Sequence, residues 1–416
     1  MKILNIFKKV MTYSLYLLLI FTFVYLVYFI NTQDPSKKRL RKELKSIVKK
    51  NTFIKNLYND YREDFLPDTQ FIKVDFKKID LDFLNLNSCY FGKCYTFFLE
   101  QYNEKLIIAD RKGNIKITTF KNLDKNDPIF SNIQTNLNFD YILDTHVYKN
   151  DIYITGKKDI GDKTFLEIVR GKFDEKKINF ENIIKLRSEN CVLRHAVHSG
   201  KIQIYNNNEN KILLAVNHAG GMDGGSLENL SADSICGKIL LIDAKNKSYE
   251  IFSSGHRNIS GLYTDKDVII SAEHGPHAGD EINKIKKGNK YGWPIVSHGE
   301  KYSRDKNDEE PNYKKNHKEN GFEEPIFSFV PAIGISEIIK LPNNFSKLWQ
   351  DNFLLASLHG KYLYRIRFDE EYNKIIYYEP IFIGDRIRDL IYVHDSKKIL
   401  LALELEGALG IITNQN

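Results

Sequence analysis

Six short apolar runs recur along the chain after residue 100, and each is followed by a polar turn and a second apolar run. They begin at intervals of roughly 45 to 85 residues. Repeats of short strands at about this period are typical of propeller blades, and helical periodicity is almost absent after residue 70. The pattern predicts an all-β fold, a six-bladed β-propeller. The six runs are Leu106–Ala109, Ile152–Thr155, Ile212–Ala215, Val268–Ser271, Phe353–Ala356 and Ile399–Ala402.

The N-terminal segment has a different pattern, because Val10–Gln33 contains no charged residue. About 20 apolar residues are enough for a helix to cross a bilayer. A cleaved signal peptide is the alternative, but Tyr28–Gln33 offers no small-residue cleavage site. The pattern therefore favours a retained transmembrane anchor within residues 1–36. Basic residues follow at positions 37–42, so the positive-inside rule leaves the orientation open.

Leu40, Leu44 and Ile47 recur at helical spacing among lysines, and Pro67 ends this pattern. We therefore predict a short helical stalk at residues 37–70 and the propeller at residues 71–416. The longest interval between repeats, from the fourth to the fifth, contains residues 301–324. This stretch is rich in Asn, Lys and Glu, which indicates a long surface loop of the kind that often borders a site.

The net charge of +7 is spread along the chain, with dense basic runs only at residues 37–50 and 314–318. A nucleic-acid-binding protein would need a basic stripe with interleaved aromatic residues on one face. We therefore predict no nucleic-acid partner. The basic run at residues 37–50 is placed to contact anionic lipid headgroups beside the anchor.

Polar and turn-forming residues are densest around the fourth apolar run, in Gly255–Leu262, Glu273–Asn283 and Tyr291–Pro294. These segments read G-x-R-N-x-x-G-L, then E-H-G-P, then D-E-x-N, and finally Y-G-W-P. Their order and spacing resemble the glucose/sorbosone dehydrogenase family, soluble sugar dehydrogenases that use pyrroloquinoline quinone. As a compound signal the match is strong, although each piece alone is weak. The resemblance implies a six-bladed propeller, a quinone cofactor, calcium and a sugar substrate.

His198 is the candidate general base, because an imidazole titrates near neutral pH. The resemblance supports this role, since the family's catalytic histidine opens a similar H-x-G segment. His195 is a competing candidate, and a purely structural histidine at the start of a strand is the alternative. Because no side chain accepts a hydride, oxidation of a sugar also requires a cofactor.

Four residues are implied by the resemblance to hold the tricarboxylate quinone: Arg257, Asn258, Arg386 and Arg388. Guanidinium groups suit carboxylates because they pair with them through two hydrogen bonds, and Arg257 is also expected to polarise the reacting centre. Arg386 and Arg388 match the family's R-x-R-D and, being two apart on a strand, share a face. The alternative for this pair is a surface ion pair with Asp389.

Calcium is implied at the backbone carbonyls of Gly275 and Pro276, and a second calcium at the carboxylate of Glu281. Oxygen ligands suit this hard cation. The alternative is that Asp280 and Glu281 cap a turn or pair with Lys284.

The chain also departs from the family pattern at three positions. A cofactor-contacting Gln is missing from Asn138–Asp144, and His359 stands where a Lys is expected. No acid that would orient the base lies at Val216–His218, which leaves Asp223 as a substitute. We expect His359 to replace the Lys in part by binding the cofactor when it is protonated.

The sequence thus predicts oxidation of a sugar or related hydroxy compound to a lactone or acid, dependent on pyrroloquinoline quinone. The family's export implies a protein of the bacterial inner membrane whose propeller faces the periplasm, with an electron acceptor that the sequence does not identify. The alternative is a diverged, non-catalytic propeller that binds a glycan or a protein partner. The enzyme requires His198, Arg257, Gly275 and Arg388 to line one axial cavity.

Overall fold

The computed structural model describes residues 69, 72–89, 92–125, 127–161, 163–187, 200–217, 234–301 and 313–415. The chain divides into two compact units, Met1–Leu66 and Pro67–Asn416. The predicted anchor at residues 1–36 and nearly all of the predicted stalk at residues 37–70 lie outside the described residues. Within the described ranges, no helix has both the length and the hydropathy that crossing a membrane requires.

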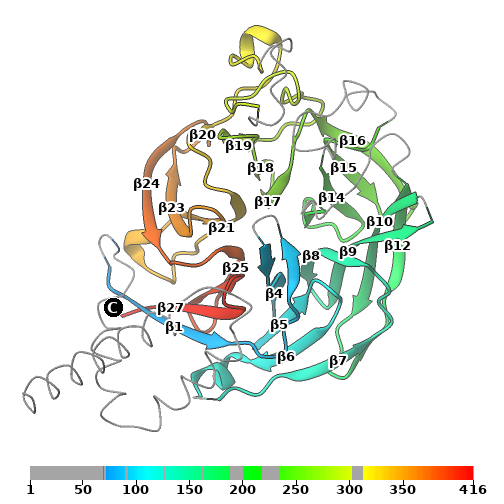
Figure 1. The fold of residues 1–416 in the computed structure, drawn as a ribbon, viewed down its shortest axis with the longest axis vertical. Helices are drawn as coiled ribbons and strands as arrows, with labels where there is room; N and C mark the ends of the chain where they lie inside the picture. The colour runs from blue at the N-terminus through cyan, green and yellow to red at the C-terminus, as the bar shows by residue number, and fades with distance from the viewer. Residues whose placement is uncertain are drawn as a thin grey trace, which may run out of the picture. The chain divides into compact units, whose positions relative to one another are not determined.

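The second unit is a six-bladed β-propeller whose four-stranded antiparallel sheets surround one axis (Figure 1). Blades 1 to 3 are formed by β4 (Phe97–Tyr102), β5 (Lys105–Asp110), β6 (Ile115–Thr119) and β7 (Ser131–Thr135); by β8 (Tyr141–Tyr148), β9 (Asp151–Ile160), β10 (Lys163–Lys172) and β12 (Glu181–Arg187); and by β13 (Ile202–Ile204), β14 (Lys211–Val216), β15 (Lys238–Asp243) and β16 (Ser248–Ser254). A short parallel strand, β11 (Lys177–Ile178), extends the first blade at β7.

Blades 4 to 6 follow the same order. They are formed by β17 (Ile259–Asp265), β18 (Val268–Glu273), β19 (Asp280–Lys284) and β20 (Phe327–Phe329); by β21 (Ile335–Lys340), β22 (Phe353–Ser357), β23 (Tyr362–Phe368) and β24 (Ile375–Phe382); and by β25 (Ile387–Val393), β26 (Lys398–Leu403), β27 (Ala408–Asn414) and β1 (Val74–Asp80). The remaining described elements are the hairpin β2 (Asn87–Cys89) and β3 (Gly92–Cys94) and three 3₁₀ turns, η2 (Phe120–Asp124), η5 (Lys318–Asn320) and η6 (Lys347–Trp349).

The sixth blade closes the ring with strands from both ends of the propeller. β1 is its outermost strand and pairs antiparallel with β27, from Val74 opposite Asn414 to Asp80 opposite Ala408. Strands from the two ends of the domain therefore pair within one blade.

Each of the six apolar runs is the second strand of a blade, so the repeat prediction is confirmed. These strands are buried on both faces because a neighbouring blade covers each side. One hydrophobic cluster illustrates this, since it joins Leu354 and Leu363 of blade 5 to Leu390 and Leu401 of blade 6. Continuous burial explains why the runs lack the apolar–polar alternation of a half-exposed strand.

The innermost strands β4, β8, β13, β17, β21 and β25 contact one another in turn around the axis. Hydrogen bonds link the neighbours: the Leu99 amide of β4 donates to Asp389 of β25, and the Ser260 hydroxyl of β17 donates to the Ile335 carbonyl of β21. Register shifts near the beginning of β8, β17, β21 and β25 mark bulges. Bulges re-aim side chains, and here they lie where polar residues approach the axis.

Candidate active site

The start of each innermost strand and the end of the following strand lie at the same end of a blade, because the two are antiparallel. Arg257 and Asn258 precede β17, and Arg386 precedes β25, whereas His274–Pro276 follow β18 and His359 follows β22. The repeat itself therefore brings residues far apart in sequence to one face of the propeller.

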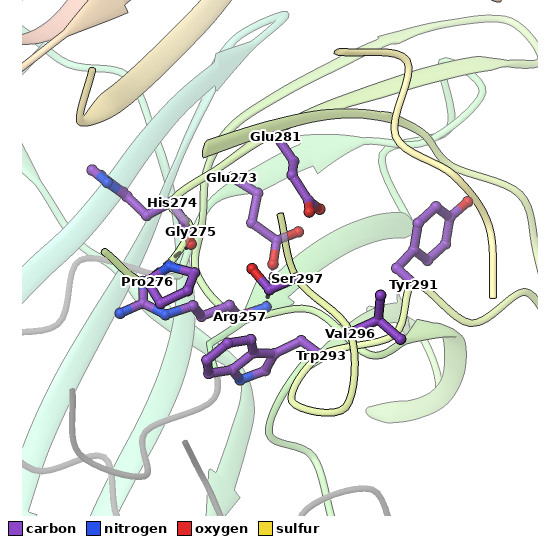
Figure 2. A pocket seen from close by; sticks show the side chains of 10 residues that line it. All are labelled: Arg257, Glu273, His274, Gly275, Pro276, Glu281, Tyr291, Trp293, Val296 and Ser297. Atoms are coloured by element: carbon purple, nitrogen blue, oxygen red, sulfur yellow. Dashed lines mark hydrogen bonds between the residues drawn. The ribbon is translucent and has the colours of Figure 1, made fainter. Parts of the chain in front are cut away.

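One pocket on this face gathers four of the predicted residues, Arg257, Gly275, Pro276 and Glu281, and is partly open to solvent. Figure 2 shows the carboxylates of Glu273 and Glu281 pointing toward its centre, with Arg257 beside Trp293. The full lining is Arg257, Glu273, His274, Gly275, Pro276, Glu281, Tyr291, Trp293, Val296 and Ser297.

The Gly275-Pro276 turn is held by Asp280, which is buried. One oxygen of Asp280 accepts from the Gly275 amide at 3.0 Å, and the other accepts from the amides of Gly334 and Ile335 at 2.6 and 3.1 Å. Asp280 thus caps the turn and joins blade 4 to blade 5. A Cβ on Gly275 would fall 2.1 Å from the Gly279 carbonyl oxygen, so only glycine fits there.

Glu273 is fixed by two partners at the back of the pocket. One carboxylate oxygen accepts from the Arg257 amide, and the other lies 3.2 Å from Nδ1 of His256. Nε2 of His256 in turn lies 2.8 Å from the hydroxyl of Ser253. Because Ser253 and His256 are both about 1% exposed, this series of hydrogen bonds orients Glu273 and does not contact a substrate.

Glu281 is a buried carboxylate whose negative charge has only weak partners. Asn283 donates to it at 3.3 Å, and Nε2 of His317 lies 3.5 Å away. Burial and the nearby charge of Glu273 raise its pKa well above the usual range. Two carboxylates that face one pocket favour either a proton or a bound cation there. The alternative pairing with Lys284 is not formed, since that ammonium donates to the Glu371 carbonyl.

Arg257 is oriented by contacts on two sides. Its Nη1 donates to the His274 carbonyl at 3.1 Å, and its guanidinium lies 5.3 Å from the centre of the Trp293 ring. In the neighbouring residue Asn258, the buried Oδ1 has no hydrogen-bond partner in the described part of the chain. An unsatisfied polar atom beside a pocket is consistent with a ligand that supplies the missing partner.

Arg386 and Arg388 both pair with Glu404, which follows β26. Nε of Arg386 lies 3.0 Å from one carboxylate oxygen, and Nη2 of Arg388 lies 2.7 Å from the other. Burial opposes ionisation of Glu404, but the two guanidinium groups outweigh it and lower its pKa to about 2. All three side chains are buried, so the suggested surface ion pair with Asp389 is wrong. Asp389 instead accepts from the amides of Leu99 and Leu390.

His274 shows that the arginines converge on the pocket. Burial and the positive charges of Arg257, Arg388 and Arg386 together lower its pKa to about 3. An imidazole that feels all three cations must lie near each of them, because charge interactions fall off with distance. His274 itself lines the pocket, so the arginine pair on β25 and the pocket on blade 4 form one region.

Arg111, which sequence reasoning missed, belongs to the same cationic region. It follows β5, is 2% exposed, and lies with its guanidinium 4.4 Å from the centre of the Tyr141 ring. Its buried Nη1 has no hydrogen-bond partner in the part of the chain that the structure describes. Burial and the charge of Arg388 lower its pKa. The signal that could have found Arg111 is its place directly after an apolar run, where His274 and Glu404 also stand.

Four predicted residues of the described ranges, Asn258, His359, Arg386 and Arg388, do not line this pocket. His359 is exposed in the turn after β22 and is absent from the pocket lining. His198 lies outside the described residues, as do His195 and Asp223. Gly200, which leads into β13, is described, and its carbonyl accepts from the Thr155 hydroxyl at 2.6 Å.

A second buried cluster, here called the axial acid cluster, lies on the innermost strands: Glu100, Asp144, Glu337 and Asp389. Its cation is Lys201, whose Nζ lies 2.9 Å from Asp144 and also pairs with Glu337. Burial raises the pKa of Asp144 to about 6 and that of Glu337 to about 8, although Lys201 opposes both shifts. No part of the sequence analysis anticipated these contacts.

Comparison with known proteins finds relatives of this chain in sequence and in fold. The aldose sugar dehydrogenase YliI of Escherichia coli is 30% identical over 171 residues, which are 40% of this chain and 44% of that protein. The chain thus spans about two fifths of the length of the curated relatives that it matches.

Solved structures show the same fold at low identity. The soluble aldose sugar dehydrogenase of Escherichia coli in its apo-form has a TM-score of 0.64 at 18% identity and covers 82% of this chain and 99% of its own. The PQQ-bound aldose sugar dehydrogenase of Streptomyces coelicolor has a TM-score of 0.57 at 17% identity, covering 84% and 100%. A model of the family described as "Glucose / Sorbosone dehydrogenase" matches residues 96–410. The chain therefore belongs to the glucose/sorbosone dehydrogenase family.

Proposed function

We propose that this protein oxidises a sugar or a related hydroxy compound to a lactone or acid, with pyrroloquinoline quinone as cofactor. The observation that carries the proposal is the pocket that joins Arg257, Gly275, Pro276 and Glu281 beside a buried group of arginines. The family and the PQQ-bound relative from Streptomyces coelicolor support the choice of cofactor.

The residues present fit an anionic cofactor. Arg111, Arg257, Arg386 and Arg388 bring four positive charges, of which Glu404 neutralises one. Nη1 of Arg111 and Oδ1 of Asn258 are buried without a hydrogen-bond partner within the described ranges. A tricarboxylate would accept from the guanidinium groups, which favour such ligands because of their charge and fork geometry. When bound, the quinone supplies the acceptor for the hydride that no side chain can take.

The pocket also fits calcium. In the described part of the chain, the carbonyls of Gly275 and Pro276 accept none of the backbone hydrogen bonds that hold the surrounding turns. Glu281 adds an incompletely compensated carboxylate in the same pocket. Carbonyl and carboxylate oxygens are the ligands that calcium prefers. Gly275 and Pro276 would hold one ion, and Glu281 would hold a second.

His198 is the proposed general base, which takes the hydroxyl proton of the substrate. Its support is its place in the repeat: it precedes β13 just as Arg257 precedes β17, and the starts of the innermost strands lie on one face. Arg257 would hold the oxygen on which negative charge develops. Its guanidinium is already oriented by His274 and Trp293, so the polarising group needs little reorganisation.

A non-catalytic propeller that binds a glycan or a protein partner is the second candidate. Two observations favour it: Glu404 already pairs with both Arg386 and Arg388, and His359 lies outside the pocket lining. The two candidate functions differ in whether the arginine region, which consists of Arg111, Arg257, Arg386 and Arg388, binds a cofactor at all.

The deciding experiment is a titration of the full-length chain with pyrroloquinoline quinone, with and without calcium, followed by the absorbance of the bound quinone. Arg257→Ala and Arg388→Ala should weaken binding, while Arg367→Ala, an exposed arginine on β23, serves as the matched control. His198→Ala should retain binding but lose sugar-dependent reduction of an artificial acceptor. Failure of the unmodified chain to bind the quinone at any calcium concentration would leave the non-catalytic propeller as the function.

We also propose that residues 10–33 anchor the protein in the bacterial inner membrane with the propeller in the periplasm. The support is the uncharged apolar segment and the resemblance to an exported family. In spheroplasts, external protease should degrade the propeller. Protection until the cells are lysed would place it on the cytoplasmic side.

A further inference from the structure

Two histidines and a glutamate meet in the segment between β19 and β20, at the outer side of the pocket. Ligand atoms of His298, His317 and Glu324 all lie within 4.8 Å of one another. Oε2 of Glu324 lies 3.6 Å from Nδ1 of His317 and 3.8 Å from Nε2 of His298. Ligands that lie about 2.0 to 2.2 Å from a tetrahedral zinc ion are separated from one another by about 3.5 Å.

His317 is the unusual member of this group. The residue is 1% exposed, yet neither ring nitrogen has a hydrogen-bond partner in the described part of the chain. Nδ1 faces Glu324 and Nε2 faces Glu281, 3.5 Å away. Buried polar atoms are nearly always satisfied, so an imidazole without a partner between two carboxylates indicates a missing ligand.

The side chains around His317 are oriented so that they could bind one ion together. Oε1 of Glu324 accepts from the Lys318 amide at 2.8 Å, which leaves Oε2 turned toward both histidines. The rings of His298 and His317 are stacked with their centroids 5.0 Å apart. The side chains of His298 and Glu324 are 33% and 42% exposed, so an ion can reach the cluster from solvent. The charge of Lys315 acts on His298, and its ammonium pairs with Glu300 at 2.9 Å.

The donor set selects the class of metal. Calcium and magnesium take oxygen ligands, whereas two imidazole nitrogens and one carboxylate suit zinc and its neighbours. Metal-bound histidines almost always donate their other ring N–H to a carboxylate or carbonyl, which fixes the ring. Glu281 faces Nε2 of His317, the ring nitrogen that does not face Glu324, and can therefore accept that N–H.

We propose that His298, His317 and Glu324 form a zinc-type metal site, with Glu281 accepting the Nε2–H of His317 and a fourth position open to water. The site ties the segment around η5 to β19, beside the pocket. It differs from the proposed calcium sites because two of its three ligands are ring nitrogens. It also does not rest on the proposed function, since the three ligands would bind metal whether or not a quinone binds.

The test uses the untagged full-length chain, stripped with chelator and titrated with Co²⁺, whose visible absorption reports tetrahedral nitrogen and oxygen ligation. The unmodified chain should bind one Co²⁺ in this site, and Zn²⁺ should displace it while millimolar Ca²⁺ should not. His317→Ala and His298→Ala should each weaken binding by at least about 100-fold, because even an outer partner contributes roughly 10- to 100-fold. Glu281→Gln should cost about 10-fold.

His394→Ala is the matched control, because His394 is exposed on blade 6 and should leave the Co²⁺ spectrum unchanged. If loss of the buried His317 ring unfolds the chain, the half-exposed His298 variant still decides the question. The proposal is overturned if the unmodified chain gives no tetrahedral spectrum, if His298→Ala binds Co²⁺ as well as the unmodified chain, or if Ca²⁺ displaces Co²⁺ completely.

Discussion

The arginine region and the axial acid cluster are two ways of burying charge in one propeller. The first holds Arg111, Arg257, Arg386 and Arg388, of which the last two share Glu404, and Nη1 of Arg111 has no hydrogen-bond partner among the described residues. The second holds four carboxylates against Lys201. A buried charge without its counter-ion is costly. The excess positive charge of the first region and the excess negative charge of the second must therefore be compensated in different ways.

In the axial acid cluster the carboxylates are used by the fold itself. Asp144 accepts from the Ile202 amide at 2.9 Å, Glu100 from the Val147 amide at 3.1 Å, and Asp389 from the Leu99 amide at 2.7 Å. Each of these bonds joins one innermost strand to the next. The arginines make few such bonds to neighbouring blades, so their surplus charge remains for a ligand. We therefore expect that removing the cation of the acid cluster lowers the free energy of unfolding. Removing a cation of the arginine region should instead lower the affinity for the ligand.

The largest expected effect is that of Lys201→Met on stability. It leaves the buried carboxylates without a cation, and breaking a buried pair from one side costs about 3 to 5 kcal/mol. Urea unfolding of the full chain should show this loss in the free energy of unfolding. Lys211→Met, which removes a lysine from a half-exposed pair with Asp243 at 3.0 Å, should cost no more than about 1 kcal/mol. Equal losses in both variants would remove the distinction between the clusters.

Arg111→Met should act on binding instead. Its Nη1 has no hydrogen-bond partner within the described ranges, so we expect little loss of stability in the protein without cofactor. Quinone affinity should fall about 10- to 100-fold, because a hydrogen bond to a charged group contributes roughly 1.5 to 3 kcal/mol. Thermal melting tests the expected stability, and quinone titration of the same samples tests the expected loss of affinity. A large fall in melting temperature with unchanged quinone affinity would make Arg111 a structural residue like Lys201.

The acid cluster should also give the stability a pH dependence. Burial raises the pKa of Glu337 from 4.5 to about 8, so the folded state binds this proton more tightly than the unfolded state. That contribution is present at low pH and is lost as the pH rises from about 4.5 to about 8. The free energy of unfolding should therefore fall as the pH rises across this range. Urea midpoints across this range should show a flatter profile for Glu337→Gln, and an identical slope in both proteins would refute the assignment.

The smallest effect concerns His359, in the turn after β22. If its side chain donates to the quinone where the family has a lysine, His359→Ala should weaken quinone binding. Because the side chain is exposed, the change should stay below about fivefold, the value of a solvated polar pair. Quinone titration of both proteins measures it, and an unchanged affinity would remove His359 from the binding residues.

The sequence predicted the six second strands because they are covered on both sides, and burial on both faces leaves an unbroken apolar run such as Val268–Ser271. It indicated Gly275 only through the family resemblance, and the structure gives the reason for glycine there, because a Cβ would meet the Gly279 carbonyl oxygen. It did not indicate Arg111 or Glu404. Each is one charged residue after an apolar run, and only the knowledge that these positions share a face makes them conspicuous.

The sequence by itself therefore determined the repeat, the sheet class and the residue types at the turns, because these depend on local burial and backbone conformation. Only the tertiary structure decided which charges meet. It paired Arg386 and Arg388 with Glu404 rather than Asp389, gave Lys201 to Asp144 and Glu337, and set His317 between Glu281 and Glu324. Such pairings depend on the angle between blades and on bulges near the axis, and a linear pattern of apolar and polar residues does not contain these distances.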